Sequence, residues 1–218
     1  MMIYKRLVRI AKKIVSDYKY IHDPEHKKTP PPGYKKTERG WSLSDGRIEK
    51  MVGTKQPMSR EQKKLHRIAK RGERGDRLSV AKNNQTHPKT LQMLSKDRDD
   101  SIRYAVSENP NTSFRTLKKM SNDRSWGVLR NIARHRNSTQ PLLKKLSNHE
   151  SEQVRAGVAS NPRTFQKTLD ILSKDKHDFV REHVAKNPHT RKKTLKKMLK
   201  DESKLVSGLA NKNINSRQ

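Results

Sequence analysis

The chain contains no cysteine among its 218 residues. Disulfide bonds and sites that hold zinc or iron–sulfur clusters through cysteine are therefore excluded. Hydrophobic residues are also scarce, at 29%, where soluble domains usually have roughly 45–50%. A chain with so few hydrophobic residues and so much charge partly has the composition of a disordered protein. No apolar run approaches the roughly 20 residues that a membrane-spanning helix needs, so we expect no transmembrane segment.

Acidic residues are scarce as well, with 22 Asp and Glu against 52 Lys and Arg, and the formal net charge is +30. A charge of this size favours fast, salt-sensitive association with a polyanion. Aromatic residues are few, with three Phe, five Tyr and two Trp. If the polyanion is a nucleic acid, we expect little base stacking and low sequence specificity.

What the sequence does have is an internal repeat of 26 residues. Neither a helix nor a strand produces so long a period, and a short repeat of fixed length is typical of solenoid proteins. Leucine recurs at each step, and asparagine recurs at each step except at His135. The residues concerned are Leu65, Leu91, Leu117, Leu143, Leu169 and Leu195, and Asn83, Asn109, Asn161, Asn187 and Asn213. We expect the leucines to form one buried seam and the asparagine amides to bond between neighbouring turns.

Each repeat contains the pattern of two short helices. One helix has an apolar pair four residues apart, such as Val154 and Val158, which places both residues on one face. The other follows a segment such as Asn109-Pro110-Asn111-Thr112. Proline there ends the preceding helix, and the threonine is predicted to cap the next one. The fold class is therefore all-α, an α-solenoid of about five to six helix-pair repeats.

The chain divides into four parts. We expect residues 1–20 to form a basic amphipathic helix that packs on the solenoid or its partner. We expect residues 21–57 to form a proline-containing linker or extended arm. Residues 58–213 form the solenoid, which begins at a capping-box pattern, Ser59 to Gln62. Residues 214–218 form a tail.

The segment from Val154 to Thr164, which continues to Leu169, Leu172 and Asp175, resembles the variant leucine-rich repeat. This family belongs to the wider group of HEAT-like helical repeats, and the resemblance covers about residues 59–213. It implies an architecture only, because such folds host protein, DNA and RNA binding alike. HEAT-like relatives include DNA glycosylases, whose pocket needs an acid framed by aromatics. Only the neighbourhood of Trp126 and Asp123 could supply one here.

Two sets of basic residues recur in register. For the arginines Arg77, Arg103, Arg155 and Arg181, we expect ion pairs between helices inside each repeat. The expectation rests on aspartates that precede arginines at a fixed interval: Asp97 before Arg103, Asp175 before Arg181 and, more loosely, Asp123 before Arg130. The basic residues of the leucine-containing helices have too few matching acids, so we expect them to form ladders that bind phosphate groups. Their alternative role is a solvated outer face. They are Lys89, Arg115, Lys118, Lys119, Lys144, Lys145, Lys167, Lys193, Lys196 and Lys197.

These patterns predict a non-enzymatic, intracellular, soluble protein, cytoplasmic or nucleoid-associated, that binds nucleic acid through its lysine ladders. Structured RNA or a ribonucleoprotein is preferred to DNA. The alternative is an adaptor whose concave face engages an acidic protein, and a third class is a HEAT-like glycosylase. No catalytic constellation, metal site or cofactor is predicted, because neither the nine histidines nor the serines have partners at suitable spacing.

Overall fold

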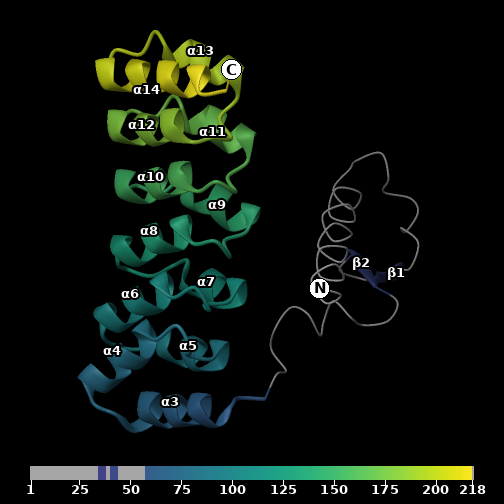
Figure 1. Cartoon of the computed structure of the whole chain (residues 1–218), viewed down its shortest axis with the longest axis vertical. Helices are drawn as coiled ribbons and strands as arrows, with labels where there is room; N and C mark the ends of the chain where they lie inside the picture. Colours follow the sequence, from purple (N-terminus) through teal and green to yellow (C-terminus); the bar gives the residue numbers. More distant parts are fainter. Residues whose placement is uncertain (1–33, 38–39, 44–56, 218) are drawn as a thin grey trace. The chain divides into compact units, whose positions relative to one another are not determined.

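The computed structural model describes residues 34–37, 40–43 and 57–217 (Figure 1). The chain divides after Pro57, and the unit Met58–Gln218 holds the repeats. Its described residues form twelve α-helices, labelled α3 to α14. They stack as an α-solenoid, which confirms the predicted fold class for this part of the chain.

The stack starts with helix α3 (Arg60–Arg71), which the predicted capping box begins. The Ser59 hydroxyl accepts the Gln62 backbone N–H, and the Gln62 side chain accepts the Ser59 N–H, each at 3.1 Å. Two free donors at the helix start are thereby satisfied. At the other end, a Cβ on Gly72 would lie 2.7 Å from the Ile68 carbonyl oxygen. Only glycine therefore fits the corner that leads into the next helix.

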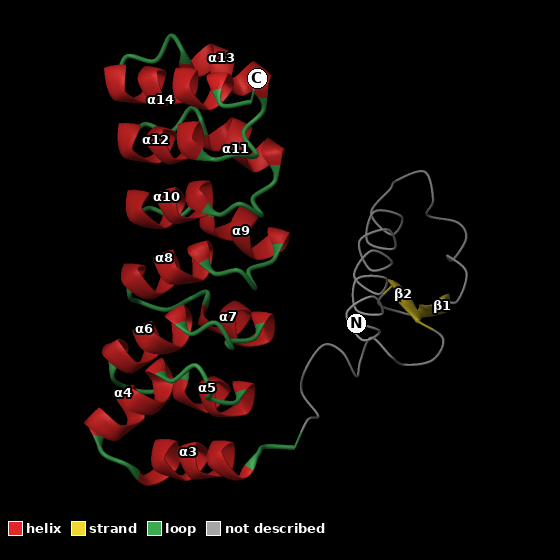
Figure 2. Ribbon diagram, in the orientation of Figure 1, coloured by secondary structure: helices red, strands yellow, loops and turns green. Residues whose placement is uncertain are grey.

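Eleven further helices lie in two layers, which Figure 2 shows as two columns of stacked ribbons. We call the members of one layer first helices because they come first in each repeat. These are α4 (Arg74–Lys82), α6 (Asp100–Glu108), α8 (Trp126–Arg134), α10 (Glu152–Ser160), α12 (Asp178–Lys186) and α14 (Lys204–Asn215). The second helices contain the repeat leucines and are α5 (Pro88–Leu94), α7 (Phe114–Met120), α9 (Gln140–Leu146), α11 (Gln166–Leu172) and α13 (Lys192–Met198).

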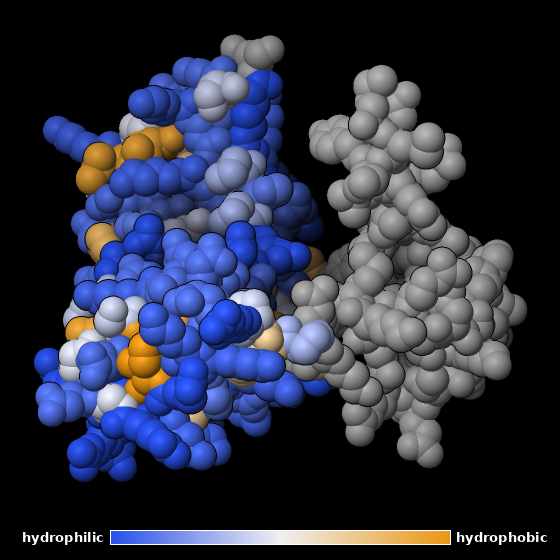
Figure 3. Space-filling model, turned by 60° about the horizontal axis from the view of Figure 1, so that its bottom comes forward, coloured by the Kyte–Doolittle hydropathy of each residue, from blue (hydrophilic) through white to orange (hydrophobic). Residues whose placement is uncertain are grey.

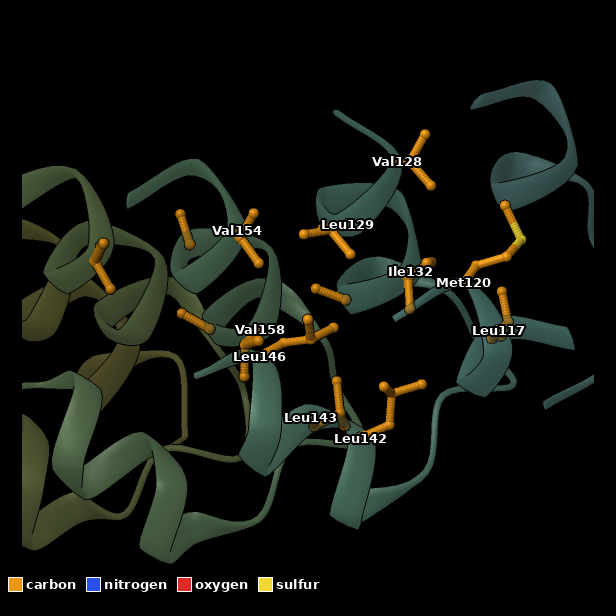
Figure 4. Close-up of a cluster of buried hydrophobic side chains, with 14 of the residues drawn as sticks. Leu117, Met120, Val128, Leu129, Ile132, Leu142, Leu143, Leu146, Val154 and Val158 are labelled. Atoms are coloured by element: carbon orange, nitrogen blue, oxygen red, sulfur yellow. The ribbon is translucent and has the colours of Figure 1, made fainter. Parts of the chain in front are cut away.

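The hydrophobic core lies between the two layers and runs through the whole stack. The five repeat leucines of the second helices are fully buried, as predicted, and so are apolar pairs of the first helices such as Val154 and Val158. Figure 4 shows how both helices of a repeat contribute side chains to this core. Each repeat buries only a few residues, so the core can be continuous although the chain is poor in hydrophobic residues.

The asparagines join successive repeats, as predicted. The Asn187 amide nitrogen donates to the carbonyl oxygens of Ala159 at 2.6 Å and Asn161 at 3.1 Å, both in the preceding repeat. Asn109, Asn161 and Asn213 make the equivalent pairs of bonds. The Ala159 carbonyl and its equivalents lie in the last turn of the first helices, where carbonyl groups lack intrahelical partners, and the amides satisfy them. They also tie each repeat to the preceding one.

The prediction that threonines cap the second helices is wrong. Each threonine hydroxyl instead donates to the backbone carbonyl oxygen six residues earlier, near the end of the first helix. Thr112 donates in this way to Val106 at 2.6 Å. Thr86, Thr164 and Thr190 do the same. The N-cap is the next residue along, and at Ser113 the hydroxyl accepts the Thr116 N–H. The threonine is one residue too early to cap the second helix.

The repeat arginines form ion pairs, but with partners other than those predicted. Arg103 binds Asp123, twenty residues later, with Nε 2.7 Å from Oδ2 and Nη2 3.2 Å from Oδ1. Asp97 was the expected partner, but Arg103 Nη1 donates only to its backbone carbonyl oxygen, at 2.9 Å. The other pairs are Arg77 with Asp97, Arg155 with Asp175, and Arg181 with Asp201. Each pair therefore links a first helix to the turn after the second helix of its own repeat.

Two further observations concern the ends of the chain. In the predicted arm, Tyr34–Thr37 (β1) and Gly40–Leu43 (β2) form an antiparallel pair in which Tyr34 is opposite Leu43. The sequence analysis did not predict this hairpin. The expected helix over residues 1–20 lies outside the described residues. At the other end, α14 extends to Asn215, into the predicted tail.

Candidate nucleic-acid interface

The two helix layers differ in charge. The five second helices carry eleven Lys or Arg residues and one acid, Asp170. The six first helices carry eleven basic and six acidic residues. Four of their arginines are also held in the ion pairs described above. Within the two layers, the excess positive charge therefore belongs mainly to the exposed residues of the second helices, which we call the second-helix face.

All ten predicted binding residues are exposed on this face. Lys89, Arg115, Lys167 and Lys193 occupy the same position near the start of α5, α7, α11 and α13, and Pro141 interrupts the series in α9. Exposed ammonium and guanidinium groups at a recurring spacing can contact successive phosphate groups of a nucleic acid.

The lysine pairs near the ends of the second helices form a less regular series. Lys118/Lys119, Lys144/Lys145 and Lys196/Lys197 are in register, but α5 has Gln92 and Met93 at these positions and α11 has Asp170 and Ile171. Asp170 accepts a hydrogen bond from Thr194 and lies 3.5 Å from Arg191 Nη1. The structure therefore divides the expected ladder into one group on α7 and α9 and another on α13.

Lys145 differs from the other members of the set because its ammonium group forms hydrogen bonds within the protein. Lys145 Nζ donates to the carbonyl oxygen of Ser121 at 3.2 Å, to its hydroxyl at 2.9 Å and to Asn122 Oδ1 at 2.5 Å. These bonds connect α9 to the end of the preceding repeat. Among the described residues, the other nine predicted binding residues form no ion pair.

The highest local density of lysine is on α13. Lys192, Lys193, Lys196, Lys197 and Lys200 line a shallow hollow of about 660 Å³ at the last second helix. Like charges this close repel one another, so a bound anion would relieve an unfavourable field.

The in-register arginines are not available for phosphate binding. Arg155 and Arg181 are buried, and each guanidinium is bound by an aspartate and by backbone carbonyls. The Arg181 hydrogen bond lowers the pKa of Asp201 below its usual value, even though burial acts in the opposite direction. These arginines hold the repeats together, as the sequence analysis expected.

One edge of the stack, which was not predicted from the sequence, has no acidic residue. It consists of the five connections from a first helix to its second helix, which we call the acid-free edge: residues 83–87, 109–113, 135–139, 161–165 and 187–191. The connections on the opposite edge contain seven acids, most of them in ion pairs. Arg136, Arg163 and Arg191 are exposed on the acid-free edge. The absence of acids was visible in the sequence, but these arginines do not recur in register.

The pocket that a glycosylase would need is not formed at Trp126 and Asp123. The Asp123 carboxylate binds Arg103 through both oxygens and also accepts the Ser125 N–H. Trp126 is 53% exposed rather than part of an enclosed wall. Among the described residues, no three His, Asp or Glu side chains are grouped as ligands for a metal ion. No helix in the described part is long and apolar enough to cross a membrane.

The face of the described helices that Figure 3 shows is mostly hydrophilic, with a few hydrophobic groups between the polar side chains. The large exposed hydrophobic residues include Tyr104 and Trp126 on first helices, and Phe114 and Phe165 at the start of second helices. Arg115 lies 5.9 Å above the Phe114 ring. Aromatic rings therefore occur beside basic residues at the starts of second helices.

Comparison with known proteins supports the fold. No family model and no curated relative matches the sequence. A solved leucine-rich repeat variant with a repetitive structural motif is similar, with a TM-score of 0.56 and 19% identity, over 72% of this chain and 62% of that one. This chain thus spans somewhat less than two thirds of that protein.

An engineered protein gives a TM-score of 0.40 at 13% identity, and covers 72% of this chain and 98% of its own. A designed armadillo repeat protein gives a TM-score of 0.38 at 11% identity, over 71% of this chain and 99% of that one. The likeness to the leucine-rich repeat variant confirms the architecture that the sequence resemblance implied, a helical repeat solenoid.

Proposed function

We propose that this protein is a non-catalytic scaffold that binds nucleic acid through its second-helix face. The observation that carries the proposal is the unequal charge of the two layers, with eleven basic residues and one acid on the second helices. Solubility does not require such a separation of charge, whereas a surface that follows a phosphate backbone does.

The proposed ligand is a structured RNA or a ribonucleoprotein rather than DNA. The lysines of the second-helix face are long and flexible, and the ladder is interrupted at α11 by Asp170 and Ile171. Such a surface suits a folded RNA, whose phosphates approach from several directions, better than a uniform duplex. Contacts to phosphate alone carry no sequence information, so specificity would come from shape.

The test compares two sets of four neutralising substitutions. In the first set, Lys118, Lys119, Lys196 and Lys197 on the second-helix face become Gln. In the matched control, the exposed Lys96, Arg98, Arg124 and Lys176 of the opposite edge become Gln. Both variants lose the same charge. Lys145 is left unchanged because it bonds to the preceding repeat.

Binding to a folded RNA is measured across a series of salt concentrations. We expect the first set to weaken binding and to reduce the slope of log K against log salt by about 0.7 to 0.9 for each lost phosphate contact. The control should change the slope much less. Equal effects would contradict a defined binding face. If neither set affects binding to RNA or DNA, the nucleic-acid proposal fails, and an adaptor for an acidic protein becomes the better hypothesis.

A further inference from the structure

The acid-free edge contains an open hollow of about 520 Å³ between two successive repeats. The residues around it that matter here are Arg163, Phe165, Lys167, His189 and Arg191. One side chain is a large aromatic ring, and the other four belong to two arginines, a lysine and a histidine. No acidic side chain lines the hollow. A ligand that fills it should therefore be flat, at least partly apolar and negatively charged.

Phe165 is the unusual residue of this hollow. It occupies the N-cap of α11, where α7 and α9 have Ser113 and Thr139. Its phenyl group cannot cap the helix, and it is 55% exposed. More than half of its surface remains in contact with water, so the ring gains only part of the stabilisation that a buried phenyl ring provides. Its contribution to the stability of the repeat is therefore small.

Hydrogen bonds on both sides hold the backbone of Phe165 in place. The Phe165 N–H donates to Gln140 Oε1 of the preceding repeat at 3.1 Å. Its carbonyl accepts the N–H groups of Thr168 at 2.9 Å and Leu169 at 3.0 Å, which are the first bonds of α11. Because the backbone is fixed on both sides of the ring, only the two side-chain torsions of Phe165 have to be ordered when a ligand packs against it.

The two arginines of the hollow are also oriented by the protein. Arg163 donates Nη1 to the carbonyl oxygen of Arg136. Arg191 donates Nε to Gln166 Oε1 at 2.7 Å, and its Nη1 lies 3.5 Å from Asp170. These bonds use only some of the five N–H donors of each guanidinium. The remaining donors are available for the oxygens of a phosphate group.

We infer that this hollow binds one unpaired nucleotide, with its base stacked on Phe165 and its phosphates against Arg163, Arg191 and Lys167. The inference rests on the proposed nucleic-acid binding and adds a preference to it. In a continuous duplex, both faces of each base are already covered by neighbouring bases. Only a nucleotide in a loop, bulge or single strand offers a free face to an aromatic ring. The protein should therefore favour a structured RNA that contains an unpaired nucleotide.

The test uses two RNA hairpins with the same stem, one fully paired and one with a single-nucleotide bulge. Phe165→Ala should weaken binding to the bulged RNA roughly five- to 150-fold, the usual effect of losing one stacked base, and leave binding to the paired stem unchanged. Phe165→Tyr keeps an aromatic ring and should preserve most of the preference. The matched control is Leu205→Ala, which removes an equally exposed apolar group from the first helix α14.

Two results would overturn the inference. One is that Phe165→Ala binds the bulged RNA as well as the unchanged protein does. The other is that it weakens both RNAs equally, because the ring would then not recognise the unpaired base. Either result leaves the phosphate-binding proposal intact as long as the lysine variants still reduce affinity. If the lysine variants have no effect, the broader proposal fails independently of Phe165.

Discussion

Arg155 holds Asp175 through two parallel hydrogen bonds, with Nε 2.6 Å from Oδ2 and Nη2 2.9 Å from Oδ1. Both side chains are almost completely buried, at 9% and 7% exposed. The equivalent positions of the middle repeat are Leu129 and His149, which are also twenty residues apart. Leu129 is buried, and His149 Nδ1 accepts the Ser151 N–H, as the aspartates accept backbone N–H groups elsewhere. The middle repeat has therefore replaced both members of the pair together.

This relationship predicts how the ion pair responds to substitution. Arg155→Leu alone leaves a buried carboxylate without its partner and should cost about 3–5 kcal/mol. Asp175→His alone should also destabilise the protein strongly, because it leaves a buried guanidinium. The double variant Arg155→Leu/Asp175→His copies the middle repeat and should recover much of the loss. Urea denaturation of the four proteins gives the coupling energy, and simple addition of the two losses would contradict the prediction.

His135 makes the stability of the stack depend on pH. It takes the place of a repeat asparagine, with Nε2 donating to the Asn109 carbonyl oxygen at 2.9 Å and Nδ1 accepting the Asn137 N–H at 3.0 Å. A ring that donates through one nitrogen and accepts through the other is neutral. Burial lowers the pKa of His135, and the positive charge of Arg136 acts in the same direction, although the Asn109 carbonyl opposes them.

The pKa of His135 is lower in the folded protein than in the unfolded chain. The unfolded chain therefore binds more protons at pH values between the two pKa values. Its contribution to stability is therefore present above about pH 6.5 and is lost as the pH falls through the folded pKa. We expect His135→Asn, which restores the residue of the other repeats, to remove the pH-dependent part of the stability that His135 contributes. Melting temperatures measured between pH 4.5 and 8 should show this loss. His189→Asn, at an exposed histidine, is the control and should retain the pH dependence of the unchanged protein.

Gly157 sets the distance between α8 and α10. A Cβ added there would lie 3.0 Å from the Arg130 carbonyl oxygen and 3.1 Å from the Ala133 Cβ. Gly157→Ala should therefore lower the melting temperature, because overpacking costs about 1–3 kcal/mol and outweighs the gain in helix propensity of up to about 1 kcal/mol.

Gly208 provides the matched comparison for that substitution. It lies in the interior of α14, and nothing approaches within 4 Å of the Cβ that an alanine would add. Gly208→Ala should therefore raise the melting temperature, since only the propensity term changes. If both alanine variants are stabilised alike, close packing of α8 on α10 does not require glycine at position 157.

Much of the solenoid could be predicted from the sequence because each repeat uses the same positions for the same contacts. The burial of Leu143 and its equivalents and the bonds of Asn187 to the preceding repeat follow from a period of 26 residues. Recurrence does not indicate how an exposed side chain is used. The role of Lys145 in joining two repeats, and the hollow around Phe165, depend on side chains that approach from a neighbouring repeat.

The threonines show a second limit of sequence reasoning. Thr112 lies between the end of one helix and the start of the next. Its hydroxyl could serve either helix, and the geometry of the turn directs it to Val106 rather than forward. Sequence establishes that a polar group is needed in such a turn, but the backbone path determines which free backbone group it reaches.

The sequence by itself determined the repeat length, the buried seam, the unequal distribution of lysine and the structural role of the arginines. Only the tertiary structure could decide which aspartate each arginine binds. The aspartate six residues before Arg103 and the one twenty residues after it, Asp97 and Asp123, are 26 residues apart and so occupy the same position of successive repeats. A periodic sequence cannot distinguish them. The choice depends on how the turn after α7 places Asp123 beside the Arg103 guanidinium, with Nε 2.7 Å from Oδ2.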